Sequence, residues 1–322
     1  MKKKRIFGVS YFSTRDKRHF AEDLREIKDA KFSYIVHTFS ERDFEFYAKS
    51  VEELVSLTKK AGLVALADPW GVLRLFGGEE YSKWLYVFPE IRQKRHDGSE
   101  GYGACPNNPK TIELLEKWID KVSEIGFDGI FWDEIHLDDI SCFCETCNDY
   151  FIDEYSIGMD YAPSSIIREF GMMSKRRLLE HLFSYSKKKG LTNTLCVLPN
   201  TSLEEIESYI YLRDLDVFSL DPYPKVLKGN FAQFMQKEVP YLLKRAKQKN
   251  LQTELWVQGF SLKKDEIGYI DYFFSLIKNL DIDRVAIWSF RATESMSYIR
   301  PEAPELVWKR FLEYTRRDGR AV

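Results

Sequence analysis

Three of the five cysteines lie within six residues, and their spacing could build a metal site. Cys142, Cys144 and Cys147 form a C-x-C-x-x-C pattern, and Cys105 precedes them in the chain. Four thiolates can close a tetrahedral structural zinc site, so we expect one zinc ion here. Free surface thiols or small packed side chains are the alternatives. His136 is a substitute ligand if Cys105 lies too far away.

Polar and aromatic side chains follow a series of short apolar runs, where a parallel barrel places its chemistry. Carboxylates, amides and aromatic rings dominate this set, which suits a sugar because glycosidic cleavage needs two carboxyl groups. Asp133, Glu134 and Asp221 are the catalytic candidates. The residues expected to bind the substrate are Tyr11, His37, Asp68, Trp70, Asn200, Tyr223, Gln258, Trp288 and Arg291.

Each of these side chains also has a structural interpretation. An acid at a strand end can cap the next helix, which is an equal alternative for Asp68. Asp221 could belong only to a turn in D-P-Y-P, and Trp288 could be a core residue. His37 is more often a satisfied polar residue than a ligand. Cys196, within an apolar run, is expected in the core.

The elements that must position these residues alternate along the chain. Eight strands are predicted at 6–12, 34–39, 63–71, 129–134, 194–200, 216–224, 253–260 and 284–290. Segments with helical periodicity separate them, for example 111–126, where Gly126 stands at the expected helix stop. Apolar strands that alternate with amphipathic helices indicate a parallel sheet covered by helices, and eight such units predict an α/β fold, a single (β/α)8 TIM barrel.

Two connections are much longer than the others, at 72–108 after the third strand and 135–162 after the fourth. Long loops in a compact domain are usually functional or disordered. They carry all the clustered cysteines, so we expect both at the carboxyl end of the barrel. We see no linker, and the prediction is one domain over 1–322.

Composition narrows the classes of partner and compartment. The 48 basic and 50 acidic residues leave a net charge of −2, so no basic surface for nucleic acid is expected. No apolar run reaches the length of a transmembrane helix, and the basic start of the chain is too briefly apolar for a signal peptide. Clustered thiols without a secretory signal indicate a reducing compartment, and we predict a cytoplasmic protein, with an oligomer possible.

Asp133-Glu134, the following CFCETCNDYF and the upstream Cys105 together resemble glycoside hydrolase family 42, the β-galactosidase type. In that family an Asn-Glu pair closes the fourth strand and four cysteines bind zinc. The resemblance covers residues 100–155 and elsewhere extends only to strand order and strand-end aromatic residues. It implies a retaining barrel glycosidase in which Glu134 is the general acid/base.

The chain departs from the family at two positions. Asp133 replaces the amide expected beside the acid/base, and Gln258 stands where the seventh strand should end in a glutamate nucleophile. An amide cannot form a covalent glycosyl-enzyme. Glu254 lies near the start of that strand. The second carboxylate is therefore sought at Asp221 first, then at Glu294.

Asp133 could itself be the nucleophile and pair with Asp221, as in retaining α-glycosidases with an aspartate on strand four and another on strand six. The leading hypothesis is a zinc-containing glycoside hydrolase acting on a small oligosaccharide or glycoside. A catalytically inactive carbohydrate-binding barrel, favoured by Gln258, and a metal-dependent sugar isomerase are the alternatives.

Overall fold

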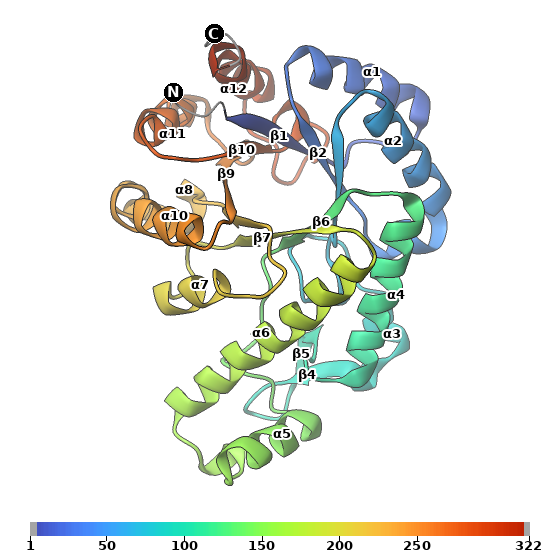
Figure 1. Ribbon diagram of the computed structural model, residues 1–322, viewed down its shortest axis with the longest axis vertical. Helices are drawn as coiled ribbons and strands as arrows, with labels where there is room; N and C mark the ends of the chain where they lie inside the picture. The colour runs from blue at the N-terminus through green and yellow to red at the C-terminus, as the bar shows by residue number, and fades with distance from the viewer. Residues whose placement is uncertain (1–4, 319–322) are drawn as a thin grey trace.

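The computed structural model describes residues 5–318 and has a closed barrel of eight parallel strands at its centre (Figure 1). The barrel strands are β1 (Ile6–Tyr11), β2 (Tyr34–Thr38), β3 (Val64–Asp68), β6 (Gly129–Asp133), β7 (Thr192–Val197), β8 (Val217–Leu220), β9 (Gln252–Gln258) and β10 (Arg284–Trp288). Strand β1 pairs with both β2 and β10, which closes the sheet on itself. The predicted (β/α)8 barrel is confirmed.

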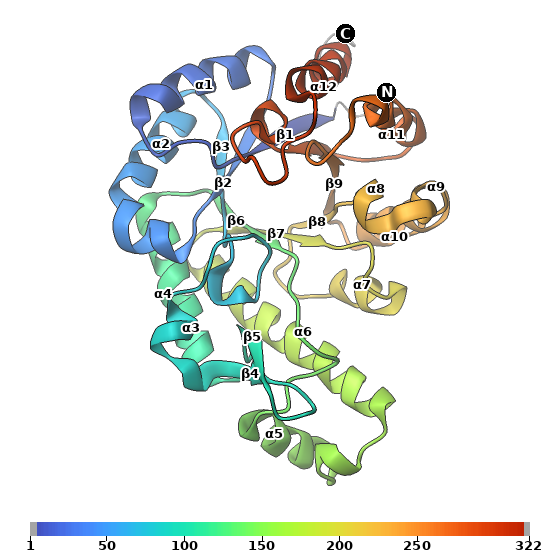
Figure 2. The ribbon, with the colours of Figure 1, turned by 180° about the vertical axis from the view of Figure 1, so that it is seen from behind.

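Helices surround the barrel in both views (Figures 1 and 2). The longer ones are α1 (Lys17–Asp29), α2 (Ala48–Lys60), α4 (Pro109–Ile125), α6 (Ser164–Lys188), α7 (Leu203–Tyr209), α10 (Val239–Gln248), α11 (Tyr269–Ile277) and α12 (Pro304–Asp318). Local sequence explains the ends of α4. Asn108 accepts a hydrogen bond from the Lys110 backbone, Pro109 occupies the first helical position, and Gly126 follows the helix with φ of 91°.

Strand alternation divides the buried side chains between two cores. The larger core lies between the sheet and the helices and includes Trp118 and Trp132. A second cluster fills the barrel and includes Tyr34, Phe131 and Trp256. Because successive strand residues face opposite cores, a shift of one position decides whether a side chain reaches the barrel interior.

The two long connections form a layer of their own beside the barrel. The first contains α3 (Trp84–Val87) and the antiparallel pair β4 (Arg92–Lys94) and β5 (Glu100–Ala104). The second contains α5 (Glu145–Tyr155), which lies near β4 and β5 in both views (Figures 1 and 2). The Phe143 amide donates a hydrogen bond to the Lys94 carbonyl at 2.8 Å, so the two connections contact each other. Short helices α8 (Pro224–Leu227) and α9 (Phe231–Gln233) follow β8.

Within residues 5–318, none of the helices combines the length and the apolar character needed to cross a membrane.

Candidate active site

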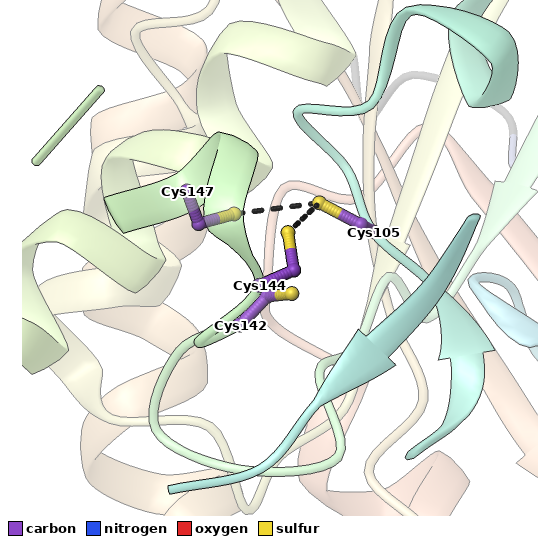
Figure 3. A group of neighbouring side chains, drawn as sticks. All are labelled: Cys105, Cys142, Cys144 and Cys147. Atoms are coloured by element: carbon purple, nitrogen blue, oxygen red, sulfur yellow. Dashed lines mark hydrogen bonds between the residues drawn. The ribbon is translucent and has the colours of Figure 1, made fainter. Parts of the chain in front are cut away.

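The four clustered cysteines meet where the two long connections join (Figure 3). Cys105 follows β5, Cys142 and Cys144 lie in the loop before α5, and Cys147 lies on α5. Their sulfur atoms all lie within 4.8 Å of one another. The Sγ atom of Cys105 is 3.3 Å from that of Cys147 and 3.5 Å from that of Cys144.

This geometry fits a tetrahedral zinc ion. With Zn–S bonds of about 2.3 Å, the sulfur atoms of such a site lie about 3.8 Å apart. The four thiols interact with one another: hydrogen bonds from the other thiols lower the pKa of Cys144, and hydrogen bonds to them raise that of Cys105. Asn107 donates hydrogen bonds to Cys147 Sγ at 3.2 Å and to Ser174 Oγ of α6 at 2.9 Å, so an amide orients one sulfur.

His136 is not part of this group. It lines a separate cavity of about 660 Å³ beside Glu134. Burial lowers its pKa to about 4, so its imidazole is neutral at pH 7. Cys196 lies inside the barrel, as expected, and its thiol also faces the carboxylate pocket described next.

A pocket of about 450 Å³ opens at the carboxyl ends of the strands. One wall is aromatic: Trp70 and Trp288 stack with ring centroids 5.1 Å apart and planes 10° from parallel. Phe131 and Trp256, with ring centroids 4.9 Å apart, belong to the same lining. Flat apolar faces of this kind suit the apolar face of a sugar ring, because binding sites combine aromatic walls with few polar groups.

Carboxyl groups also line the pocket. Asp133 and Glu134 come from the end of β6, and Asp221 follows β8; all three line the pocket. Asp68, the last residue of β3, is fully buried nearby, and neither of its carboxyl oxygens has a hydrogen-bond partner among the described residues. Burial, followed by the charge of Glu134, raises the pKa of Asp68 well above the usual range. Asp68 therefore does not act as the helix cap that was its alternative interpretation.

Asp221 and Glu134 share a hydrogen bond between their carboxyl groups. Burial raises the pKa of Asp221 well above its usual range, and the charge of Glu134 raises it further. Burial also raises the pKa of Glu134, while the hydrogen bond from Asp221 lowers it. Two like charges in contact disfavour double ionisation, so we expect the pair to keep a proton where separate carboxyl groups would both be ionised.

The first long connection supplies a carboxyl group that we did not expect. Glu79 lines the pocket, and burial raises its pKa. Gly77 and Gly78 bring it there: a Cβ on Gly77 would lie 2.3 Å from Asp133 Oδ2, and one on Gly78 would lie 2.6 Å from the Trp70 ring. The signal in the sequence was an acid behind two adjacent glycines, but it lies far from any strand end.

Seven of the residues predicted to bind substrate or catalyse line this pocket together: Trp70, Asp133, Glu134, Asn200, Asp221, Tyr223 and Trp288. Their strands bring them together because parallel strands all end at the same rim.

Tyr11 and His37 do not belong to the site, which corrects our expectation. The Tyr11 hydroxyl donates to Asp23 of α1 at 2.7 Å, and His37 Nε2 lies 3.1 Å from Thr58 Oγ1 of α2. Both side chains point from the strands toward the helices. Their neighbours of opposite parity face the interior instead.

Arg291, Glu294 and Gln258 also lie outside the pocket lining. Arg291 is exposed and pairs with Glu26 of α1 at 2.7 Å and with Glu294 at 3.4 Å. Gln258 accepts a hydrogen bond from the Lys225 backbone at 3.1 Å and donates one to the Phe260 carbonyl at 2.9 Å. Its amide therefore connects two loops rather than facing a substrate.

Glu254 faces the barrel interior below the pocket. Ser219 Oγ donates to its carboxylate at 2.8 Å and Trp256 Nε1 at 3.1 Å, and Tyr34 also donates a hydrogen bond to it. It is fully buried and does not line the pocket. Neither acid nor amide of β9 supplies the missing carboxylate.

No protein-family model matches the chain, and no curated protein sequence matches it. Solved structures with the same fold do match. A β-galactosidase from the psychrophilic Marinomonas ef1 has a TM-score of 0.67 at 10% identity, over 97% of this chain and 59% of that one. The catalytic domain of a β-amylase from Paenibacillus polymyxa has a TM-score of 0.63 at 11% identity, over 98% of both chains.

A D-allulose 3-epimerase from Methylomonas sp. also matches, with a TM-score of 0.55 at 14% identity over 98% of both chains. At such low identity these similarities establish the barrel fold and no activity. The structural neighbours of this chain include glycoside hydrolases and a sugar epimerase, so its chemistry must be argued from its own pocket.

Proposed function

We propose that this protein is a glycoside hydrolase that cleaves a small oligosaccharide or glycoside. The observation that carries the proposal is the hydrogen-bonded pair Glu134 and Asp221, which lines one pocket together with the aromatic rings of Trp70 and Trp288. Glycosidic cleavage needs one proton donor and one carboxylate, and this pair contains both. The local resemblance to family 42 supports Glu134 as the general acid/base.

In this mechanism the sugar enters between the aromatic wall and the carboxyl groups. The proton passes across the hydrogen bond from Asp221 to Glu134, which leaves an aspartate nucleophile and a glutamic acid. Glu134 then protonates the leaving oxygen as Asp221 attacks the anomeric carbon. Water, activated by the Glu134 carboxylate, later releases the sugar from Asp221 and restores the shared proton.

The closeness of the pair favours retention of configuration. Carboxyl groups lie about 5–5.5 Å apart in retaining enzymes and about 6.5–9.5 Å apart in inverting ones. Groups in hydrogen-bond contact must separate a little for the first arrangement and much more for the second. Asp133 is the alternative nucleophile, and it faces the same pocket.

Hydrolysis of a panel of α- and β-linked nitrophenyl glycosides tests the proposal. Wild-type protein should release nitrophenol from at least one of them, and Glu134→Gln and Asp221→Asn should each lower kcat/KM by about 10²-fold or more. Glu294→Gln is the matched control, because that side chain lies outside the pocket and pairs with Arg291. Unchanged turnover in Glu134→Gln would reject its role.

Two other functions make different predictions. A binding-only barrel would bind sugar with no turnover of any glycoside, including natural oligosaccharides. The structural similarity to an epimerase keeps a metal-dependent isomerase among the alternatives. Such an enzyme needs metal-binding side chains in its pocket. Within residues 5–318, the side chains that lie close enough together to hold a metal ion are the four cysteines. They do not line the pocket, which argues against a metal-dependent isomerase.

A further inference from the structure

A second cavity adjoins the carboxylate pocket on the side of the first long connection. Its volume is about 820 Å³, and it shares Gly78, Glu79 and Tyr298 with the pocket. A ligand in the pocket can therefore continue into this cavity without leaving the protein surface. The added space exceeds that of the pocket itself, so a single sugar unit would leave much of the site empty.

Three tyrosine side chains that are largely exposed to solvent line this cavity. Tyr81 is 91% exposed, Tyr298 is 87% exposed and Tyr102 is 72% exposed. They come from both sides, two from the first long connection and one from the loop after β10. Large aromatic faces gathered in one hollow mark binding sites more often than scattered single residues do.

Two arginines and one acid, Glu79, line the cavity, so positive charge predominates. The Arg74 guanidinium donates to the Gly78 carbonyl at 2.5 Å, and that of Arg92 donates to the Leu85 carbonyl at 3.3 Å. Both are half-buried, and among the described residues neither forms an ion pair with a carboxylate. Arg74 Nη1 also donates to the Glu80 carbonyl at 3.3 Å, and Arg92 Nη1 donates to the Gly101 carbonyl at 3.5 Å. Backbone carbonyls thus hold both side chains, and no described residue accepts a hydrogen bond from the Nη2 atom of either arginine. A guanidinium held in this way can donate to a carboxylate or a sulfate.

We propose that this cavity binds an acidic unit of the same sugar chain, so that the substrate is an oligosaccharide carrying carboxylate or sulfate groups. The proposal rests on the proposed function for the position of the cleaved bond. The tyrosine rings contact the sugar faces, and Arg74 and Arg92 bind the anionic group. Glu79 lies at the junction of the two spaces, where burial raises its pKa and the charge of Arg74 lowers it.

Binding to matched oligosaccharides tests this inference without turnover. Calorimetry with Glu134→Gln protein would compare neutral chains with chains of equal length carrying either uronate or sulfate groups. Acidic chains should bind about tenfold or more tightly, and the advantage should shrink at high salt. The two acidic series distinguish the carboxylate source from the sulfate source.

Variants locate the effect. Arg92→Gln and Arg74→Gln should each remove most of the preference for acidic chains, while Arg316→Gln on outer helix α12 should preserve it. Equal binding of neutral and acidic chains would overturn the inference, and so would the absence of binding to either series. Both outcomes can be recognised without the arginine variants. Turnover of neutral chains without preference would leave the hydrolase proposal standing alone, whereas acidic-chain binding with no turnover by wild-type protein would support the cavity and reject hydrolysis.

Discussion

In the proposed mechanism the Asp221 carboxyl supplies the proton that its neighbour Glu134 needs for catalysis. Because burial raises both pKa values, the singly protonated pair should persist above the ordinary carboxyl range of about 4. We expect a bell-shaped dependence of kcat/KM on pH: activity falls on the acid side when Glu134 also binds a proton, and on the alkaline side when Asp221 loses its own. An alkaline limb near pH 4 would contradict the shared proton.

Asp68 makes a prediction about stability. Its pKa is raised in the folded protein, so folding favours the protonated acid. That contribution is complete below the unfolded pKa of about 3.9 and is lost as pH rises toward the folded value. Replacing the residue, Asp68→Asn, should flatten the fall of Tm between acid and alkaline pH. Parallel curves for variant and wild type in thermal scans would show that Asp68 is ionised without cost.

At the scale of elements, the cysteine cluster connects β5 to α5 across two long connections. Cys144→Ser removes one of the four sulfur ligands, so we expect loss of zinc on mass spectrometry and a Tm lowered by several degrees. The barrel strands hold the carboxyl groups independently, so kcat should change little once the protein is folded. Cys196→Ser is the control for metal content, because that thiol lies inside the barrel. An unchanged zinc content in the Cys144 variant would show that the four cysteines do not form a zinc site.

For the whole molecule, the predicted single domain implies one cooperative unfolding transition. Phe311 of α12 is fully buried and packs on Phe7 of β1 and Phe274 of α11, with centroids 6.1 and 5.9 Å away. Phe311→Ala should cost about 3–5 kcal/mol in urea unfolding. Phe46→Ala, at a 66% exposed residue, should cost less than about 0.5 kcal/mol.

The same experiment tests the domain prediction. Circular dichroism and tryptophan fluorescence should report coincident transitions for wild type and both variants. Separate transitions would instead divide the insertion layer from the barrel as an independent unit.

Much of this molecule follows from sequence patterns. Eight apolar runs and the helices between them predicted the barrel, because burial imposes periodicity on each element locally. The fourth run located Asp133 and Glu134, and the cysteine spacing predicted a cluster that the structure brings within 4.8 Å. These features depend on near neighbours in the chain or on the shared rim of parallel strands.

Only the tertiary structure decided which strand-end residues face the pocket. Tyr11 and His37 differ by one position from interior-facing neighbours, and strand parity cannot be read when an apolar run is buried on both faces. The contact of Asp221 with Glu134, and the position of Glu79 in the same pocket, bring together segments that are distant in the chain. Their proximity depends on barrel closure and loop packing, which no local pattern encodes.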